Sequence, residues 1–308
     1  MNVSGLARTS GARSDPRRTG APGRVCVSSA WPGRFDARAT PVHRPRRSFA
    51  VLLSLWLLAG LLPAVAHAYD ASAVFDAKAG SLPLLLTVPH DGAEFLGLFP
   101  HRTKGVTVRD VGTRELAERV ADHLEKQTGR RPYLVIARVS RRQMDLNRAE
   151  VDAVESAGLL PAYRAYHEQV AIYVAELRAR FPSGALLIDV HGQSYEPATT
   201  FRGTRAGLTA SRLVAGFGPG ALQGSNSIIG ILAARGYGVN PLPEAPTLRE
   251  EARFAGGHTV FTYGSHRPDG IDAIQLEFGR QHRVDARLPE DLASAIVGFM
   301  KHHDLVAR

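Results

Sequence analysis

Ala185-Leu186-Leu187-Ile188-Asp189-Val190-His191-Gly192 is the stretch that decides the fold. Its apolar run is short and continuous, which predicts a strand buried on both faces. Apolar runs at Leu82–Val88 and Ile271–Phe278 resemble it, and amphipathic helical patterns lie between such runs. Strands that alternate with helices are typical of a sheet covered on both faces. With no repeat or linker after residue 69, we predict one α/β domain, a mixed sheet sandwiched by helices.

The spacing of apolar residues predicts eight elements in this domain. The four strands are predicted over Leu82–Val88, Pro132–Val139, Ala185–Val190 and Ile271–Phe278, and the four helices over 111–126, Pro161–Arg180, 221–235 and Leu288–His302. Asp110 is the predicted N-cap of the first helix. Gly236 is predicted to end the third helix in the left-handed conformation.

The positive charge of the chain is concentrated in its first 68 residues. The 308 residues carry 38 Lys+Arg and 29 Asp+Glu, a formal net charge of +9, but residues 1–68 alone account for +8 of it. Residues 1–48 are rich in Arg, Pro, Gly and Ser and have no hydrophobic period, which predicts a disordered leader. The nearly neutral remainder argues against a nucleic-acid partner, since such partners are bound by basic surfaces.

Residues 49–68 have the pattern of an export signal. The basic run Arg44–Arg47 precedes the apolar run Phe49–Ala66, and Ala66-His67-Ala68 is a typical cleavage site. We therefore expect an exported protein, periplasmic or secreted, whose mature domain is 69–308. The alternative is that the apolar run is not cleaved and anchors the protein in the membrane. No other contact with a membrane is predicted. Our hypothesis for the long leader is an over-extended gene prediction, with translation starting near Val42.

Polar residues follow three of the predicted strands. His90, His191 and Glu277 come at or just after the ends of apolar runs, each with a glycine nearby. Ligand sites in such sheets form at the carboxyl ends of the strands. The only cysteine, Cys26, lies in the leader, so a metal in the mature domain has only imidazole and carboxylate ligands available. Two histidines and a carboxylate are typical of catalytic zinc, which acidifies water and polarises a carbonyl.

Arg141-Arg142-Gln143-Met144-Asp145-Leu146-Asn147-Arg148 is the other segment rich in functional groups. An arginine pair is usually a solvated turn. Here, however, Asn147 places an amide donor beside the guanidinium of Arg148. Because arginine offers a planar fork of donors, the pair suits a substrate carboxylate.

Four motifs in order resemble the N-formylglutamate amidohydrolase family, which is related to aspartoacylases and zinc carboxypeptidases. They are Pro89-His90-Asp91-Gly92, the Arg141–Arg148 segment, Ile188–Gly192 and Gln275–Gly279. The resemblance covers most of residues 82–282 and implies a zinc-carboxypeptidase-like fold with one zinc ion. It also implies that Glu277 is the general base and that Arg141 stabilises the oxyanion.

The resemblance assigns further roles residue by residue. His90 and His191 would be metal ligands, Asn147 and Arg148 would bind a substrate carboxylate, and Asp145 and Asp189 would be supporting residues. His258, after two glycines, is a candidate substrate contact.

The third metal ligand is open, because the related enzymes have glutamate three residues after the first histidine and this chain has Ala93. We favour Asp110 over Glu94, and Asp91 is the weakest candidate.

These residues predict an exported zinc amidohydrolase acting on a small carboxylate-bearing substrate, an N-formyl or N-acyl amino acid or a short peptide. Export argues against deformylation of N-formylglutamate in histidine breakdown, which is a cytoplasmic task. The alternative enzyme is a carboxypeptidase-like or peptidoglycan or poly-glutamate peptidase. An alternative of another class is a non-catalytic binding protein of the same fold.

Overall fold

Seven strands of the computed structural model form one mixed sheet in the order β1-β3-β2-β4-β7-β5-β6. The structure describes residues 71–305, which belong to one unit, Val65–Arg308. The strands are β1 (Phe75–Lys78), β2 (Leu84–Val88), β3 (Tyr133–Ala137), β4 (Leu186–Gln193), β5 (Thr199–Gly203), β6 (Gly238–Asn240) and β7 (Asp272–Gly279). The central strands β3, β2, β4 and β7 are parallel. β1 runs antiparallel to β3 and β5 runs antiparallel to β7, whereas β6 is parallel to β5.

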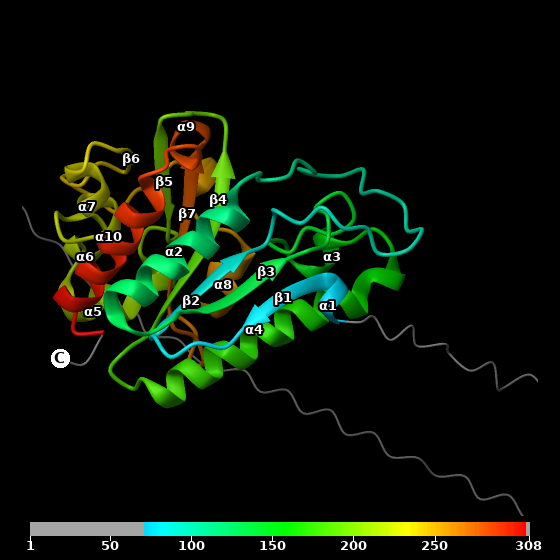
Figure 1. Cartoon of the computed structure of the whole chain (residues 1–308), viewed down its shortest axis with the longest axis horizontal. Coiled ribbons are helices and arrows are strands. Elements are labelled where there is room, and N and C mark those ends of the chain that lie inside the picture. The colour runs from blue at the N-terminus through cyan, green and yellow to red at the C-terminus, as the bar shows by residue number, and fades with distance from the viewer. Residues whose placement is uncertain (1–70, 306–308) are drawn as a thin grey trace, which may run out of the picture. The chain divides into compact units, whose positions relative to one another are not determined.

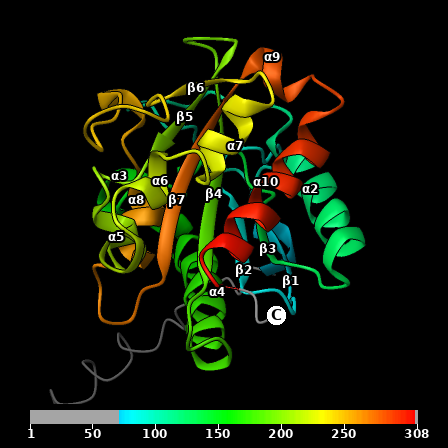
Figure 2. The same ribbon diagram turned by 90° about the vertical axis from the view of Figure 1, so that its left-hand side faces the viewer.

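Helices cover both faces of this sheet (Figures 1 and 2). One core contains α2 (Thr113–Thr128), α7 (Ile228–Ala234) and α10 (Leu288–His302), and the other contains α4 (Leu160–Arg180) and α8 (His258–Tyr263). Successive residues of β2 alternate between the two cores, with Leu84 and Leu86 in the first and Leu85 in the second. This is the period-2 pattern of a strand buried on both sides.

Shorter helical segments complete the described chain. They are α1 (Ala71–Val74), α3 (Glu150–Ala153), α5 (Ser211–Phe217), α6 (Gly220–Gln223) and α9 (Arg280–Arg283), with single 3-10 turns η1 (Ala157–Leu159), η2 (Leu208–Ala210) and η3 (Ala252–Phe254).

The predicted fold class, a single-domain mixed sheet sandwiched by helices as in zinc carboxypeptidases, is confirmed. All four predicted strands are present as β2, β3, β4 and β7, and α10 has its predicted bounds. One side of α4 faces the core, where Tyr166, Val170 and Leu177 are fully buried. These elements share long apolar patterns, which determine both their type and the side that faces the core.

The helix predicted over 221–235 is instead two helices, α6 and α7. The chain leaves the helical path at Gly224, and Ser227 restarts it by accepting a hydrogen bond from the Gly230 N–H. Serine favours this N-cap position because its side chain competes with the helical backbone for hydrogen bonds. Gly236 does adopt the predicted left-handed conformation, with φ 93°.

Asp110 does not cap α2 as predicted, because the N-cap residue is Gly112 and it makes no side-chain cap bond. The carboxylate that stabilises this helix start is Asp91, which accepts a hydrogen bond from the Arg114 N–H over 2.7 Å. Asp91 also pairs with Arg109 at 2.6 Å. The side chain of Asp110 is therefore free to point elsewhere.

The predicted leader 1–48 and signal segment 49–68 lie outside the described residues. Within residues 71–305, we find no helix with both the length and the apolar character needed to cross a membrane.

Candidate active site

The ends of three neighbouring strands bring the predicted catalytic residues together. β4 lies between β2 and β7 and runs parallel to both. His90 follows the end of β2, while His191 and Glu277 are register partners on β4 and β7. Asp110 reaches the same edge from the loop before α2, where its N–H donates to the His90 carbonyl oxygen over 3.0 Å.

Three buried side chains, His90, Asp110 and His191, form a group that fits a metal ion. Nδ1 of His90 and Nδ1 of His191 lie 3.1 Å apart. Oδ2 of Asp110 is 3.4 Å from the former and 3.3 Å from the latter. In a tetrahedron with zinc–ligand distances of about 2.0–2.1 Å, ligand atoms are about 3.3–3.4 Å apart. The three donor atoms therefore have the spacing of one face of a zinc site.

A buried carboxylate supports each histidine from behind. Nε2 of His90 lies 2.7 Å from Asp145, and Nε2 of His191 lies 2.8 Å from Asp189. Asp189 also accepts a hydrogen bond from the Thr87 hydroxyl over 2.6 Å. If Nε2 carries the proton in each ring, Nδ1 presents a lone pair to the group, the arrangement usual for metal-binding histidines. These contacts match the supporting role predicted for the two aspartates.

The environment keeps two carboxylates of the group ionised. Burial opposes ionisation of Asp110, but its contacts with His191 and His90 hold the pKa of this carboxyl well below the usual value. Burial also opposes ionisation of Asp145, where the charge of His90 and then that of Arg141 lower the pKa. A metal ligand must be deprotonated, so Asp110 is prepared for this role.

Glu277 lies beside the metal-binding group and is only 8% exposed. Its Oε1 accepts a hydrogen bond from Nε2 of Gln275 over 2.9 Å. Burial raises the pKa of the Glu277 carboxyl above its usual value, against the opposing charge of His191. A glutamate with a raised pKa is suited to take up and release a proton.

Gln275 was not among the predicted site residues, although it belongs to the quoted Gln275–Gly279 motif. Its Oε1 accepts from the Gly257 N–H over 2.7 Å and from Nδ2 of Asn147 over 3.3 Å. Because both donors bind Oε1 of Gln275, the amide is oriented with its NH₂ group towards Glu277. The alternation of side chains in a strand, which puts residues 275 and 277 on one face, was the available signal.

The structure does not bring Glu94 to the metal-binding group. Its side chain is 60% exposed and lies 3.7 Å from Arg138. Since Asp91 supports α2, Asp110 is the carboxylate that completes the group. The preference for Asp110 as the third metal ligand stays a prediction.

Arg141 is buried beside the group but is already engaged by protein acceptors. Its Nε donates to Asp145 over 3.0 Å, and its Nη1 lies 3.4 Å from Asp110 and 3.3 Å from the Val108 carbonyl oxygen. These bonds position both acidic residues. The predicted oxyanion role stays a prediction, and Nη2 is the nitrogen left for it.

The two predicted carboxylate-binding residues differ in their surroundings. The amide of Asn147 is held within the protein, with Nδ2 donating to Oε1 of Gln275 over 3.3 Å and Oδ1 accepting from the Thr259 N–H over 2.7 Å. Arg148 has a side chain that is 55% exposed and is 4.0 Å from Asp145. Arg148 is therefore the member of the pair that is open to a ligand.

His258 does not line the cleft at the metal-binding group. Its Nε2 lies 3.2 Å from the hydroxyl of Tyr163, which donates to the Arg148 carbonyl oxygen over 2.7 Å. Burial, followed by the charge of Arg205, lowers the pKa of His258. The structure thus places His258 behind the loop that carries Arg148, where its predicted contact with substrate would be indirect.

The cleft, which we define as the hollow of about 450 Å³ over the metal-binding group, is lined by arginines that the sequence did not single out. Arg109 pairs with Asp91. Arg253 and Arg283 have no carboxylate within 4.0 Å among residues 71–305. Arg253 lies over the Tyr195 ring, 4.1 Å from its centroid. Arg253 lies in η3, a single 3-10 turn without a periodic pattern, so nothing in the sequence signalled its position.

The glycines of the three strand-end motifs allow close approach to protein rather than to a ligand. An added Cβ would lie 2.1 Å from the Val139 carbonyl oxygen at Gly92 and 2.3 Å from the Pro197 carbonyl oxygen at Gly279. At Gly192 it would meet the Arg283 guanidinium at 2.6 Å.

The fold and the site together define an α/β protein with a buried His–Asp–His group at the carboxyl ends of its strands. Neither a scan of protein-family models nor a search of curated proteins finds a match. Among solved structures, N-formylglutamate amidohydrolase from Ralstonia eutropha JMP134 has a TM-score of 0.52 at 18% identity, covering 76% of this chain and 98% of that chain. The chain therefore has the fold of that amidohydrolase.

Weaker similarities extend over comparable lengths. A gene product of Agrobacterium tumefaciens has a TM-score of 0.45 at 14% identity, with 76% of this chain and 95% of that chain covered. A bacteriophage poly-gamma-glutamate hydrolase has a TM-score of 0.38 at 14% identity, with 76% and 92% covered.

Proposed function

We propose that this protein is an exported, zinc-dependent amidohydrolase. Its substrate would be a small molecule with a free carboxylate, an N-formyl or N-acyl amino acid or a short peptide. The observation that carries the proposal is the spacing of the His90, Asp110 and His191 donor atoms beside the buried Glu277. The amidohydrolase of known structure with this fold supports the reaction class.

His90, Asp110 and His191 would hold the ion, with the cleft side left open for ligands. When bound, zinc supplies Lewis-acid chemistry, which acidifies water and polarises a carbonyl oxygen. Asp145 and Asp189 orient the two imidazoles, and Asp145 is itself fixed by Arg141. The protein thus contributes a rigid donor set in which each histidine has one tautomer favoured.

Glu277 is the proposed general base. Its Oε1 is held by Gln275, so Oε2 is the oxygen free to take a proton from water and return it to the leaving amine. Arg141 would stabilise the oxyanion through Nη2, and Arg148 would bind the substrate carboxylate. Arg253 and Arg283 add positive charge around the same cleft.

Export is proposed from the sequence of residues 49–68. N-terminal sequencing of the exported protein should identify Tyr69 as its first residue. A mature form that starts within residues 1–40 would contradict both the cleavage site and the hypothesis of an over-extended start.

The function is tested with residues 69–308 and a panel of N-formyl amino acids, muropeptides and γ-glutamyl peptides. Acidic N-acyl substrates should be hydrolysed, and a chelator should abolish the activity until zinc is restored. Glu277→Gln should keep zinc but lower kcat at least about a hundredfold. Glu94→Gln, which removes a carboxylate outside the group, is the matched control.

Two outcomes would contradict this proposal. Near-normal turnover by the Glu277→Gln variant would exclude the general-base role. Tight, zinc-independent binding of these ligands without turnover would instead identify a binding protein.

A further inference from the structure

A second set of positive side chains lies outside the cleft, around Phe261 of α8. The guanidinium of Arg205 is 4.2 Å from the centroid of the Phe261 ring, and that of Arg267 is 5.5 Å from it. The ring of His266 stacks on the same phenyl ring at 5.0 Å. We call Arg205, His266 and Arg267 the cationic cluster.

The cationic cluster has no counter-charge of its own. Over residues 71–305, none of its three side chains has a carboxylate within 4.0 Å or a hydrogen bond from its charged or ring nitrogens. Both ring nitrogens of His266 are inaccessible to solvent and unpartnered. Burial, reinforced by the charges of Arg267 and Arg205, lowers the pKa of His266. The clustered positive charges of Arg205 and Arg267 are unfavourable without counter-charges, and a bound anion would supply one.

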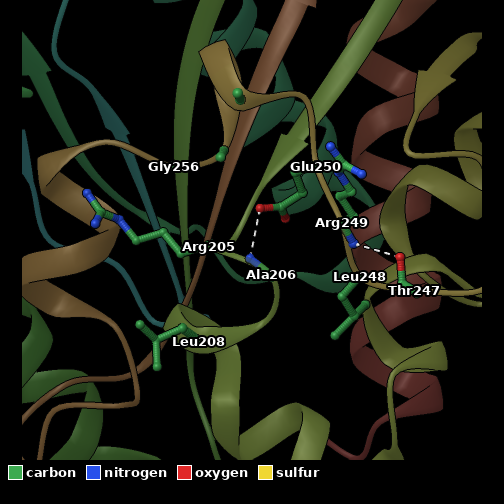
Figure 3. A pocket seen from close by; sticks show the side chains of 10 residues that line it. Arg205, Ala206, Leu208, Thr247, Leu248, Arg249, Glu250 and Gly256 are labelled. Carbon is green, nitrogen blue, oxygen red and sulfur yellow. Dashed lines mark hydrogen bonds between the residues drawn. The ribbon is translucent and has the colours of Figure 1, made fainter.

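The carboxylate of Glu250, which lines the same hollow as Arg205, is already neutralised. It is buried with Arg202, 3.0 Å away, and also accepts hydrogen bonds from the backbone N–H groups of Thr204 and Ala206. Figure 3 shows the hydrogen bond that Glu250 accepts from the Ala206 N–H. These bonds hold Arg205 and Ala206 at φ 50° and 56°, a conformation that is unfavourable for residues other than glycine. The backbone strain thus lies at Arg205, the residue that carries the guanidinium next to Phe261.

The cationic cluster adjoins the cleft across one backbone segment. Arg205 lines a side hollow of about 910 Å³ (Figure 3), and Ala252, Ala255 and Gly256 line both this hollow and the cleft. The Arg205 N–H donates to the Ala255 carbonyl oxygen over 2.7 Å. A substrate longer than one amino acid could therefore pass from the cleft over this segment to Arg205.

We propose that the cationic cluster is a second anion subsite, which binds a remote carboxylate of an elongated polyanionic substrate. Arginines stacked on an aromatic face keep the N–H groups at their edges available for a bidentate anion. The identification of the ligand as substrate rests on the proposed function, whereas the presence of the anion site does not.

The test measures binding by calorimetry to the Glu277→Gln variant, which separates binding from turnover. The probes are N-acetyl-glutamate, N-acetyl-triglutamate and the neutral N-acetyl-triglutamine. N-acetyl-triglutamate should bind more tightly than the other two. Adding Arg205→Gln and Arg267→Gln should weaken its binding about tenfold or more and leave N-acetyl-glutamate unchanged.

The matched control replaces two exposed cations of α2 by Arg119→Gln and Lys126→Gln, which removes the same charge elsewhere. Thermal unfolding establishes that both double variants fold. Inorganic phosphate should compete with N-acetyl-triglutamate only when the cationic cluster is intact. Equal affinity of both double variants for N-acetyl-triglutamate would overturn the proposal. So would phosphate binding at the cationic cluster that leaves N-acetyl-triglutamate affinity unaffected.

Failure of the proposed function gives a different result. If the unmodified protein hydrolyses none of these amides but N-acetyl-triglutamate still binds in a cluster-dependent manner, the subsite stands and the hydrolase assignment falls.

Discussion

Gln275 shows how one residue links the parts of the site. Its amide donates to Glu277 and accepts from the backbone of Gly257, so it orients the proposed base relative to the loop beside the cleft. A hydrogen bond to a charged group contributes about 1.5–3 kcal/mol. Much of that contribution would be lost if the amide were replaced by an apolar side chain of similar length.

Gln275→Met should therefore lower kcat about tenfold or more, with a smaller change in KM. Gln193→Met is the matched control, because Gln193 is a buried glutamine of β4 whose amide bonds only the backbone of Glu196 and Thr199. Steady-state kinetics and unfolding measurements on both variants distinguish a positioning role from a general loss of stability. Equal kcat values for the two variants would show that Gln275 does not position Glu277.

The two histidines of the metal-binding group and the proposed base Glu277 could be selected from the sequence, but the third ligand could not. His90, His191 and Glu277 follow apolar runs, and parallel strands place such residues at one edge of a sheet. The sequence left Asp110 and Glu94 as alternatives, since both lie in irregular segments whose path depends on tertiary contacts. Arg253 in η3, Arg283 in α9 and the cationic cluster likewise depend on how short segments are placed by tertiary contacts, so no spacing rule identifies them.

At the scale of elements, the segment 255–258 joins α8 to the cleft. A Cβ at Gly257 would lie 2.2 Å from Nδ2 of Asn147. Gly257→Ala should therefore displace this segment and lower kcat/KM, with a stability cost of about 1–3 kcal/mol. Gly216→Ala in α5 is the control, because no atom lies within 4 Å of the added Cβ, and it should stabilise the protein by about 0.5–1 kcal/mol.

Element prediction succeeded where the apolar pattern was long. α4 and α10 carry apolar residues on one side over several helical turns. In contrast, β6 has only three residues, and β5 consists of Thr, Phe, Arg and Gly without an apolar pattern. Strands of that kind form because β7 and its neighbours provide hydrogen-bonding partners, which local sequence does not reveal. The same applies to β1, which pairs antiparallel with β3.

At the scale of the whole molecule, buried histidines couple stability to pH. Burial, with the nearby charge of His258, lowers the pKa of His167 to about 3, against 6.5 when exposed. The neutral form is favoured in the folded state, so its contribution to stability is complete above pH 6.5 and is lost as the pH falls towards 3. For His167 alone, the loss between pH 6.5 and 4.5 is about 2–3 kcal/mol.

Metal-free protein should accordingly unfold at lower denaturant concentration in mild acid, and His167→Gln should reduce this pH dependence. The metal is removed with a chelator before these measurements, because acid also releases metal from histidine ligands and would change the stability by that route. Denaturant titrations at pH 7 and pH 4.5 measure the effect. An unchanged pH dependence in the variant would contradict the assignment to His167.

The central claim is that His90, Asp110 and His191 hold the ion on which amide hydrolysis depends. The most direct measurement is zinc titration into metal-free protein, following amine release from an N-formyl amino acid. We expect the activity of the unmodified protein and of Glu94→Ala to rise until one equivalent of zinc per protein has been added. The activity of Asp110→Ala should not rise. Hydrolysis that is undiminished in the metal-free protein, or stoichiometric zinc retained by Asp110→Ala, would contradict it.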